Sequence, residues 1–215
     1  SYSMGIDNGK GLKAIYANLK DSLPTLRNSP FYKNKEAFYL SYTKKISPEL
    51  SAGVFTELSR NISDMEPFNK IAEIHLTWDP VKNLRLQNRI KTQRGQNGGR
   101  FEVIHKVKDV TFRSRFEVVN TSEGSGFLSY ASFRYSKDYI VEGRLVLYET
   151  ENWDSRIYAY ENDLPGKFTI KQFSGSGRRF YILLGEKILP VKLYLKWGVD
   201  FKENASHIVG IAFSI

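Results

Sequence analysis

The 215-residue chain has no cysteine and little proline, and each of these absences narrows the structures it can form. Without cysteine, disulfides and thiolate metal sites are excluded. Only 7 prolines interrupt the chain, which leaves room for long regular elements. No stretch approaches the roughly 18 apolar residues that a transmembrane helix requires. If this chain spans a membrane, it must do so as a closed β-barrel, because only helices and barrels satisfy every backbone group in lipid.

The composition is rich in aromatic residues and in positive charge. There are 13 Tyr, 14 Phe and 3 Trp, and 32 Lys and Arg oppose 23 Asp and Glu, giving a formal net charge of +9. Such a basic excess is compatible with nucleic acid, with an acidic surface or with an anion-lined pore. The first residue is Ser1 and no charged-then-apolar leader follows it. We therefore expect either a removed secretory signal or a fragment of a longer protein.

Apolar residues recur at every second position through most of the chain, which is the period of a β-strand. The clearest segment places one apolar face on residues 191–202, made of Val191, Leu193, Leu195, Trp197, Val199 and Phe201. Similar alternation is present in residues 72–78, 84–91, 101–108, 110–118 and 127–136. These segments predict amphipathic strands with one apolar and one polar face.

The connections between these segments alternate between short and long. Short turns are predicted at Ser47-Pro48, Asp79-Pro80, Lys108-Asp109, Lys137-Asp138 and Leu189-Pro190. Longer connections rich in Gly and Ser are predicted at residues 60–69, 93–99, 121–126 and 174–177. Strands of about 9–11 residues joined in this way are typical of an outer-membrane barrel. We therefore predict an all-β, antiparallel transmembrane β-barrel of about 12–14 strands over residues 35–215, complete or as the C-terminal part of a larger barrel.

The first 34 residues have a different pattern and are predicted to form a separate N-terminal segment. Leu12, Ile15, Tyr16, Leu19 and Leu23 have helical spacing, and the prolines at 24 and 30 would end a regular element. A short helix, a loop or a plug-like segment would fit, and residues 11–19 could instead supply a further strand. The Gly9-Lys10-Gly11 turn could grip a phosphate as in a helix-hairpin-helix element, but a structural loop is the simpler interpretation.

Basic residues lie on the polar faces of many predicted strands. In a barrel wall they must face the lumen, because Arg or Lys facing lipid at the midplane costs about 2–4 kcal/mol. The lumen-facing candidates are Arg85, Arg89, Lys91, Lys106, Arg113, Arg115, Arg144, Lys192 and Lys196. A basic lumen would favour anions. The alternative is that these residues pair across strands with Glu73, Glu102, Glu117, Glu142 and Asp200.

No pattern of residues points to an enzyme. The chain lacks the nucleophile elbow, the phosphate loop and the paired-histidine zinc motif. His75, His105 and His207 fall on different predicted strands, so no metal site and no cofactor are expected. Asp154 and Ser155, near a predicted loop, are the nearest approach to a catalytic pair. We predict a non-enzymatic protein.

Several runs of residues together resemble a known family. They are residues 112–115, 126–130, 152–163, 173–181 and 191–197. These runs resemble the C-terminal β-barrel region of Bacteroidetes helix-hairpin-helix domain-containing envelope proteins, over about residues 110–200. The most specific part of the resemblance contains Asp154, Ser155, Arg156, Tyr158, Tyr160 and Glu161. The resemblance implies an outer-membrane barrel and no catalytic role, and the family's DNA-binding label rests on an N-terminal region that these runs do not include.

Three functions fit these patterns. The first is a porin-like barrel in the bacterial outer membrane, channel-like or a scaffold in an envelope complex, with a basic polar lumen. Its partners would be outer-membrane lipid and, where they exist, other envelope proteins or missing barrel strands. The second is a soluble β-rich binding module, such as a sandwich or a lipocalin-like barrel, which would use fewer and shorter strands. The third is a DNA-associated envelope protein, although the basic residues are spread over many strands, and nucleic acid is not an expected partner of this segment.

Overall fold

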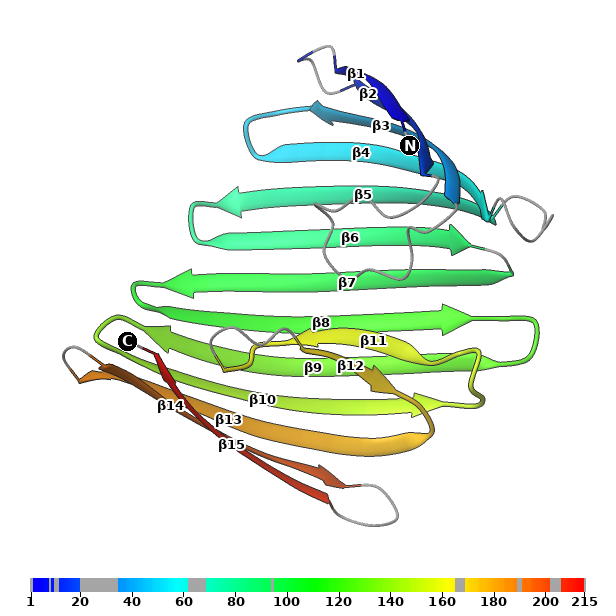
Figure 1. Cartoon of the computed structure of the whole chain (residues 1–215). Helices are drawn as coiled ribbons and strands as arrows, with labels where there is room; N and C mark the ends of the chain where they lie inside the picture. Colours follow the sequence, from blue (N-terminus) through cyan, green and yellow to red (C-terminus); the bar gives the residue numbers. More distant parts are fainter. Residues whose placement is uncertain are drawn as a thin grey trace. The chain divides into compact units, whose positions relative to one another are not determined.

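The computed structural model describes most of the chain, and all of its regular structure is β-strand (Figure 1). The described residues are 2–7, 9, 12–19, 35–61, 69–93, 95–164, 169–188, 191–201 and 206–214. Within these ranges, no helix is long and apolar enough to cross a membrane.

The main sheet has 13 strands and a second sheet has two. The strands of the main sheet are β1 (Tyr2–Asp7), β2 (Leu12–Leu19), β3 (Lys35–Lys45), β4 (Leu50–Asn61), β5 (Asn69–Val81), β6 (Leu84–Gln93), β7 (Gln96–Val107), β8 (Val110–Asn120), β9 (Ser125–Ser136), β10 (Tyr139–Thr150), β13 (Ser176–Ile188), β14 (Val191–Phe201) and β15 (Ser206–Ser214). They follow one another in chain order, except that β10 pairs directly with β13. The intervening β11 (Ile157–Glu161) and β12 (Thr169–Phe173) form a separate antiparallel hairpin. The predicted all-β, antiparallel class is confirmed, and the architecture is consistent with a transmembrane β-barrel.

The chain divides into two compact units, of which the first comprises residues 1–78 and 88–97. It contains β1 to β4, paired as consecutive antiparallel hairpins. The helical option for the N-terminal segment is wrong for residues 12–19, which form β2 and pair with β3 from Leu12↔Tyr42 to Leu19↔Lys35. Eight residues are too few to establish a period. A helix of this length would leave many of its backbone groups without an internal partner, whereas β2 pairs with a strand on each side. Residues 20–34 lie outside the described part, and the domain boundary at residue 34 stays a prediction.

The turns differ from the predicted ones at several positions. Ser47-Pro48, Lys108-Asp109 and Lys137-Asp138 lie between strands as predicted. Asp79-Pro80 instead lies within β5, and the turn follows at residues 82–83, because proline is tolerated near a strand end. The long connection predicted at 93–99 is only two residues, and Gly95 has a φ of 74° that permits so tight a turn.

Two further predicted connections can be compared in the same way. The stretch at 174–177 shortens to two residues between β12 and β13. Leu189-Pro190 falls between β13 and β14 but lies outside the described residues. Gly9, from the predicted glycine turn, lies between β1 and β2 with a φ of 65°, as expected for a structural loop.

The second unit comprises residues 79–87 and 98–215 and carries the β11–β12 hairpin on one face of its sheet. Backbone hydrogen bonds fix the base of the hairpin, from Thr150 N to Gly175 O (2.9 Å) and from Glu151 N to Ser125 O (2.9 Å). Where the hairpin leaves the sheet it passes very close to β9, since a Cβ at Gly126 would lie 2.2 Å from the carbonyl oxygen of Ser155. Glycine at 126 is therefore required for this approach.

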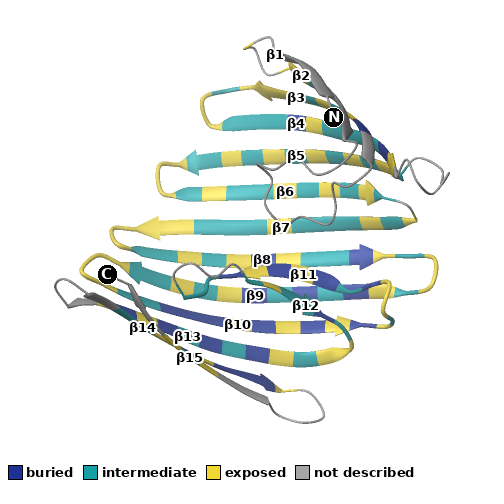
Figure 2. Ribbon diagram, in the orientation of Figure 1, coloured by how far each residue is buried: buried dark blue, intermediate teal, exposed yellow. Residues whose placement is uncertain are grey.

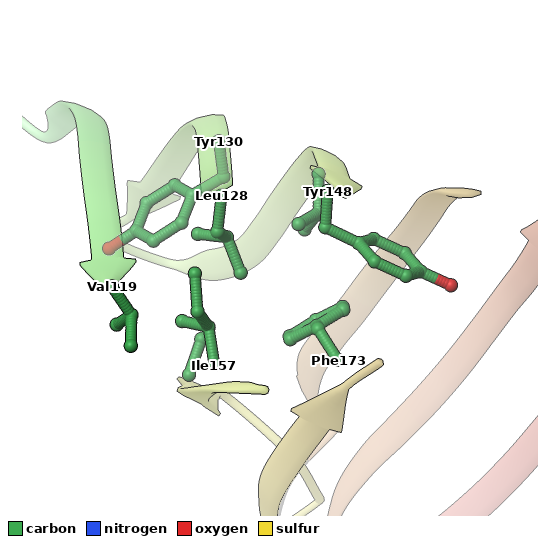
Figure 3. Close-up of a cluster of buried hydrophobic side chains, with 8 residues drawn as sticks. Val119, Leu128, Tyr130, Tyr148, Ile157 and Phe173 are labelled. Atoms are coloured by element: carbon green, nitrogen blue, oxygen red, sulfur yellow. The ribbon is translucent and has the colours of Figure 1, made fainter. Parts of the chain in front are cut away.

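An apolar core joins the base of the hairpin to the sheet (Figure 3). It consists of Val119, Leu128, Tyr130, Tyr148, Ile157 and Phe173, with Val146 and Ala159. Leu128 is fully buried and Ile157 and Phe173 are each 1% exposed. The rings of Tyr148 and Phe173 lie 4.9 Å apart, centroid to centroid. The hairpin is therefore packed onto the sheet and is not a free loop.

Two isoleucines on opposite faces of the hairpin test this packing. Ile157→Ala removes buried methyl groups from the core and is expected to lower the free energy of unfolding by about 2–5 kcal/mol. Ile170→Ala is the matched control, because Ile170 is 56% exposed on the other face, and a change of less than about 0.5 kcal/mol is expected. Chemical denaturation followed by tryptophan fluorescence measures both. Equal effects of the two substitutions would contradict the docked hairpin.

Candidate functional site

Buried and exposed residues alternate along strands of the second unit's sheet (Figure 2), and one of its faces exposes large apolar side chains. In a water-soluble domain large apolar side chains mostly lie inside, although single exposed ones are common. Here a contiguous set is 39–52% exposed, namely Phe112, Phe116, Phe133, Leu145, Leu147, Leu184, Leu195, Trp197 and Phe201. The register places these residues on one face of neighbouring strands β8, β9, β10, β13 and β14. We call this set the apolar face.

The opposite face of the same strands, which carries the hairpin, buries charge. Its buried ionisable side chains on the sheet are Arg115, Glu142, Arg144, Arg179, Lys196 and Asp200, each no more than 7% exposed. Side chains alternate across a strand, so this arrangement follows directly from the register. We call it the polar face. Charges outside and apolar residues inside are the rule for soluble domains. This unit departs from that rule, because it buries these charges beside the apolar core under the hairpin and exposes large apolar side chains on its other face.

The first unit has the same two-faced pattern. Its apolar face exposes Val54, Ile74, Leu76 and Trp78 by 41–56%. Val54 and Ile74 are directly paired across β4 and β5. The intervening residues are polar, and Glu73 forms an ion pair with Arg89 on this other side of the strand. Alternation of this kind is therefore not confined to the hairpin-bearing unit.

Three cations of the polar face bind the backbone of β11 along the edge that β12 leaves open. Arg115 donates to the carbonyl oxygen of Tyr158 (3.3 Å) and Arg144 to that of Tyr160 (2.6 Å). Lys196 donates to that of Asn162 (3.0 Å), just beyond β11. These carbonyls belong to alternate residues and so point to one edge of the strand. The cations thus satisfy backbone acceptors that would otherwise be unpaired.

A buried ion-pair network fixes the far end of the hairpin. Arg179 of β13 forms a bidentate pair with Glu161 of β11, Nε to Oε1 at 2.6 Å and Nη2 to Oε2 at 2.9 Å. Asp200 of β14 accepts from Arg179 (2.7 Å) and from Lys171 of β12 (3.0 Å). Lys196 lies 3.6 Å from Glu161. Two hairpin residues and three sheet residues thus form one network, and Asp163, 3.4 Å from Lys196, supplies a third carboxylate for its three cations.

Glu142 organises a second group of contacts beside this network. It accepts hydrogen bonds from the Tyr181 hydroxyl (2.6 Å), the Asn162 amide (2.6 Å) and Arg134 (2.9 Å). The Arg144 guanidinium lies 4.5 Å from the ring centre of Tyr130, a cation–π contact. Each buried charge on this part of the face is thereby paired or covered.

The basic residues predicted to face the lumen lie on the polar faces, and most have a carboxylate partner. Arg85 pairs with Asp79 (2.8 Å), Arg113 with Glu102 (3.1 Å) and Arg89 with Glu73. Arg115 pairs with Glu117, and Arg144 lies 3.9 Å from Glu142. Lys91 also makes a polar contact, while Lys106 is exposed. The side chain of Lys192 lies outside the described residues. The pairing expected with Glu73, Glu102, Glu117 and Glu142 is therefore present, and that of Asp200 is made by Arg179.

The residues of the family-like run build the hairpin and its base. Ser155 is buried, and its hydroxyl donates to the carbonyl oxygen of Asn152 (3.1 Å), so it is a turn residue and not an activated nucleophile. Asp154 is exposed. Arg156 lies 4.8 Å from the Trp153 ring centre and donates to the Tyr158 hydroxyl (2.6 Å). These contacts support a structural role for the run.

Four residues of the site were not among the sequence candidates: Arg179, Tyr181, Tyr130 and Lys171. Arg179 and Tyr181 alternate with Phe180 and Ile182 along β13. This alternation in the sequence could have indicated that Arg179 and Tyr181 lie on the polar face. The pairing of Arg179 with Glu161 was not readable, because it depends on the hairpin folding back onto the sheet.

The three histidines lie in β5, β7 and β15. His75 packs over Gly53, His105 is exposed, and the side chain of His207 lies outside the described part. Among the described residues no three His, Asp or Glu side chains are arranged to hold a metal ion.

Comparisons with known proteins give distant structural similarities, two of them to porins. No family model matches the chain, and no curated protein matches it. NanC porin, in a rhombohedral crystal form, is similar at a TM-score of 0.41 with 12% identity, covering 85% of this chain and 94% of that chain. KdgM porin is similar at a TM-score of 0.35 with 10% identity and the same coverage of 85% and 94%. At TM-scores below 0.5 these similarities carry no functional argument, which has to come from the chain's own side chains.

The buried pair gives a direct test of the site. Glu161→Gln leaves the buried Arg179 without its bidentate partner, and a loss of about 3–5 kcal/mol in the free energy of unfolding is expected. The control is Asp79→Asn, which breaks the exposed pair with Arg85 and should cost less than about 1 kcal/mol. Chemical denaturation compares the two. A loss for Glu161→Gln no larger than for Asp79→Asn would show that the network does not hold the hairpin.

Proposed function

We propose that this chain is the membrane-embedded part of a channel-like bacterial outer-membrane β-barrel without enzymatic activity. The observation that carries the proposal is the distribution of side chains over the second unit's sheet. One face exposes large apolar side chains, with the exposed Arg178 among them beside Leu147 and Phe201, and the other face buries six ionisable residues. In a bilayer, the apolar face contacts lipid and the polar face lines the lumen. Water would be an unfavourable surrounding for so large an apolar surface.

The strand lengths support the same proposal. From β3 onward the strands of the main sheet have 9–13 residues, and spanning a bilayer takes about 9–11 tilted residues. Soluble strands are usually shorter, about 5–6 residues. Connections at one end of the second unit's sheet are two residues, at 108–109 and 137–138, whereas the other end carries the whole hairpin. Short turns at one end and longer loops at the other are typical of outer-membrane barrels.

The proposal has four further parts: closure of the barrel, the family relationship, a scaffold role and a basic lumen. Closure of the barrel requires β1 and β15, which end the strand order, to meet each other or further strands. A relationship to Bacteroidetes helix-hairpin-helix envelope proteins stays a prediction from the family-like runs. The same holds for a scaffold role in an envelope complex. A basic lumen also remains a prediction, since cations of the polar faces are paired with carboxylates both beneath the hairpin and outside it.

The soluble binding module is the second candidate, and fractionation separates it from the barrel. A folded barrel should be extracted from membranes only by detergent, and should migrate faster on a gel before boiling than after it. Folding in the presence of lipid vesicles should give the same shift. Protein that stays in solution without detergent and shows no shift would contradict the membrane proposal.

A charge on the apolar face distinguishes the two candidates residue by residue. Leu145 lies in the middle of β10 and is 47% exposed, so Leu145→Arg should be nearly neutral, within about 0.5 kcal/mol, in a soluble protein. Facing lipid, the same change costs about 2–4 kcal/mol. The measurement is the yield of heat-modifiable protein in vesicles. Leu145→Phe is the control and should insert as the unchanged chain does, and normal insertion of the arginine variant would contradict the lipid-facing assignment.

A further inference from the structure

The β11–β12 hairpin occupies space on the polar face that a barrel would leave to its lumen. The hairpin is an insertion between β10 and β13, which are themselves directly paired from Tyr139↔Glu186 to Glu149↔Ser176. A short turn would join these two strands. The additional residues are instead folded back and docked along the sheet, apolar at the base and ionic at the far end.

The docked hairpin covers an excess of positive charge. The buried ionisable residues that the sheet presents here include four cations, Arg115, Arg144, Arg179 and Lys196, against two carboxylates, Glu142 and Asp200. The segment that contains the hairpin neutralises them with two carboxylates, Glu161 and Asp163, and three of its backbone carbonyl oxygens accept hydrogen bonds from the cations. Beneath the hairpin, the cations of the wall are thus withheld from any solute in the lumen.

The side of the hairpin that faces away from the sheet exposes aromatic and aliphatic side chains, unlike the charged side chains buried beneath it. Tyr158, Tyr160 and Ile170 are 44–56% exposed, and Tyr160 pairs with Ile170 across the hairpin. Gln172 lies opposite Tyr158 on the same side. None of these four side chains carries a charge at neutral pH. A solute that passes the hairpin therefore meets two phenol rings, an aliphatic side chain and an amide, together with the Arg156 guanidinium that donates to the Tyr158 hydroxyl.

From these observations we infer that the β11–β12 hairpin is a fixed constriction of the lumen, and that it lowers both the conductance and the anion preference of the channel. The inference rests on the proposed function and names the residues that set the pore's properties. Glu161 and Arg179 hold the constriction in place. Tyr160 and Ile170 are the specificity-determining residues that face the passing solute.

Deleting the hairpin gives the most direct test. Residues 152–174 are replaced by Asn-Gly. This leaves a three-residue connection, Glu151-Asn-Gly, between residues 150 and 175, which continue the register of Glu149↔Ser176, and three-residue hairpin loops with a glycine are common. The deleted residues contain three carboxylates (Asp154, Glu161, Asp163) and three basic side chains (Arg156, Lys167, Lys171). The deletion is therefore neutral in net charge, and a change in selectivity reports the wall that it uncovers.

The measurement is single-channel current in planar bilayers, with a KCl gradient to determine the reversal potential. For the deletion we expect a conductance higher by about twofold or more and a reversal potential shifted toward that of chloride. If the unchanged protein is closed, the deletion should open it. Unchanged conductance and reversal potential, or two closed proteins, would overturn the inference.

A second variant separates the effect of side-chain bulk on conductance from the effect of wall charge on selectivity. It also provides a test if the deletion variant does not fold. Tyr160→Ala with Ile170→Ala removes bulk from the outward side and leaves the buried network in place. Its conductance should rise while the reversal potential stays unchanged. A conductance equal to that of the unchanged protein would itself overturn the constriction. Failure of the proposed function gives a different result, since the unchanged protein would then not become heat-modifiable in vesicles at all.

Discussion

The bidentate ion pair between Arg179 and Glu161 is the interaction on which the arrangement of the polar face depends. A buried guanidinium without a partner is strongly unfavourable, and Arg179 is 2% exposed. Its two carboxylate partners come from the sheet and from the hairpin, at 2.7 Å and 2.6 Å. Glu161 of the hairpin thus completes the pairing of Arg179 with Asp200 of the sheet, and the sheet's cations satisfy the carbonyl oxygens at the open edge of the hairpin. The sheet and the hairpin each provide partners for buried polar groups of the other.

The same constraint explains why the apolar residues lie on the other side. Strand geometry sends alternate side chains to opposite faces, so a strand that buries Arg144 and Val146 must expose Leu145 and Leu147. In water this exposure would be unfavourable over several neighbouring strands, whereas in lipid it is favourable. One strand register therefore has two consequences. It places the apolar side chains on the face that lipid would favour, and it places the charged side chains on the face that binds the hairpin.

Much of this could be predicted from the sequence, and the remainder could not for identifiable reasons. Strict alternation in 110–118 and 191–202 is a local signal, and it gave the strands, their faces and the polar positions of Arg115 and Lys196. The 12–19 segment was ambiguous, because eight residues do not establish a period. The return of 157–173 onto the sheet was not predictable, since the partners of Glu161 and Lys171 lie 18 or more residues away in sequence.

The central claim is that the apolar face contacts lipid while the polar face contacts water, and the absence of native cysteine makes it directly measurable. Single cysteines are introduced as Leu147→Cys on the apolar face and Ile170→Cys on the outward side of the hairpin, two positions that are 42% and 56% exposed. Each protein is folded into vesicles and treated with a membrane-impermeant maleimide that is small enough to enter the lumen. We predict labelling at 170 and protection at 147 until detergent and denaturant are added. Equal labelling of both positions in intact vesicles would contradict the account.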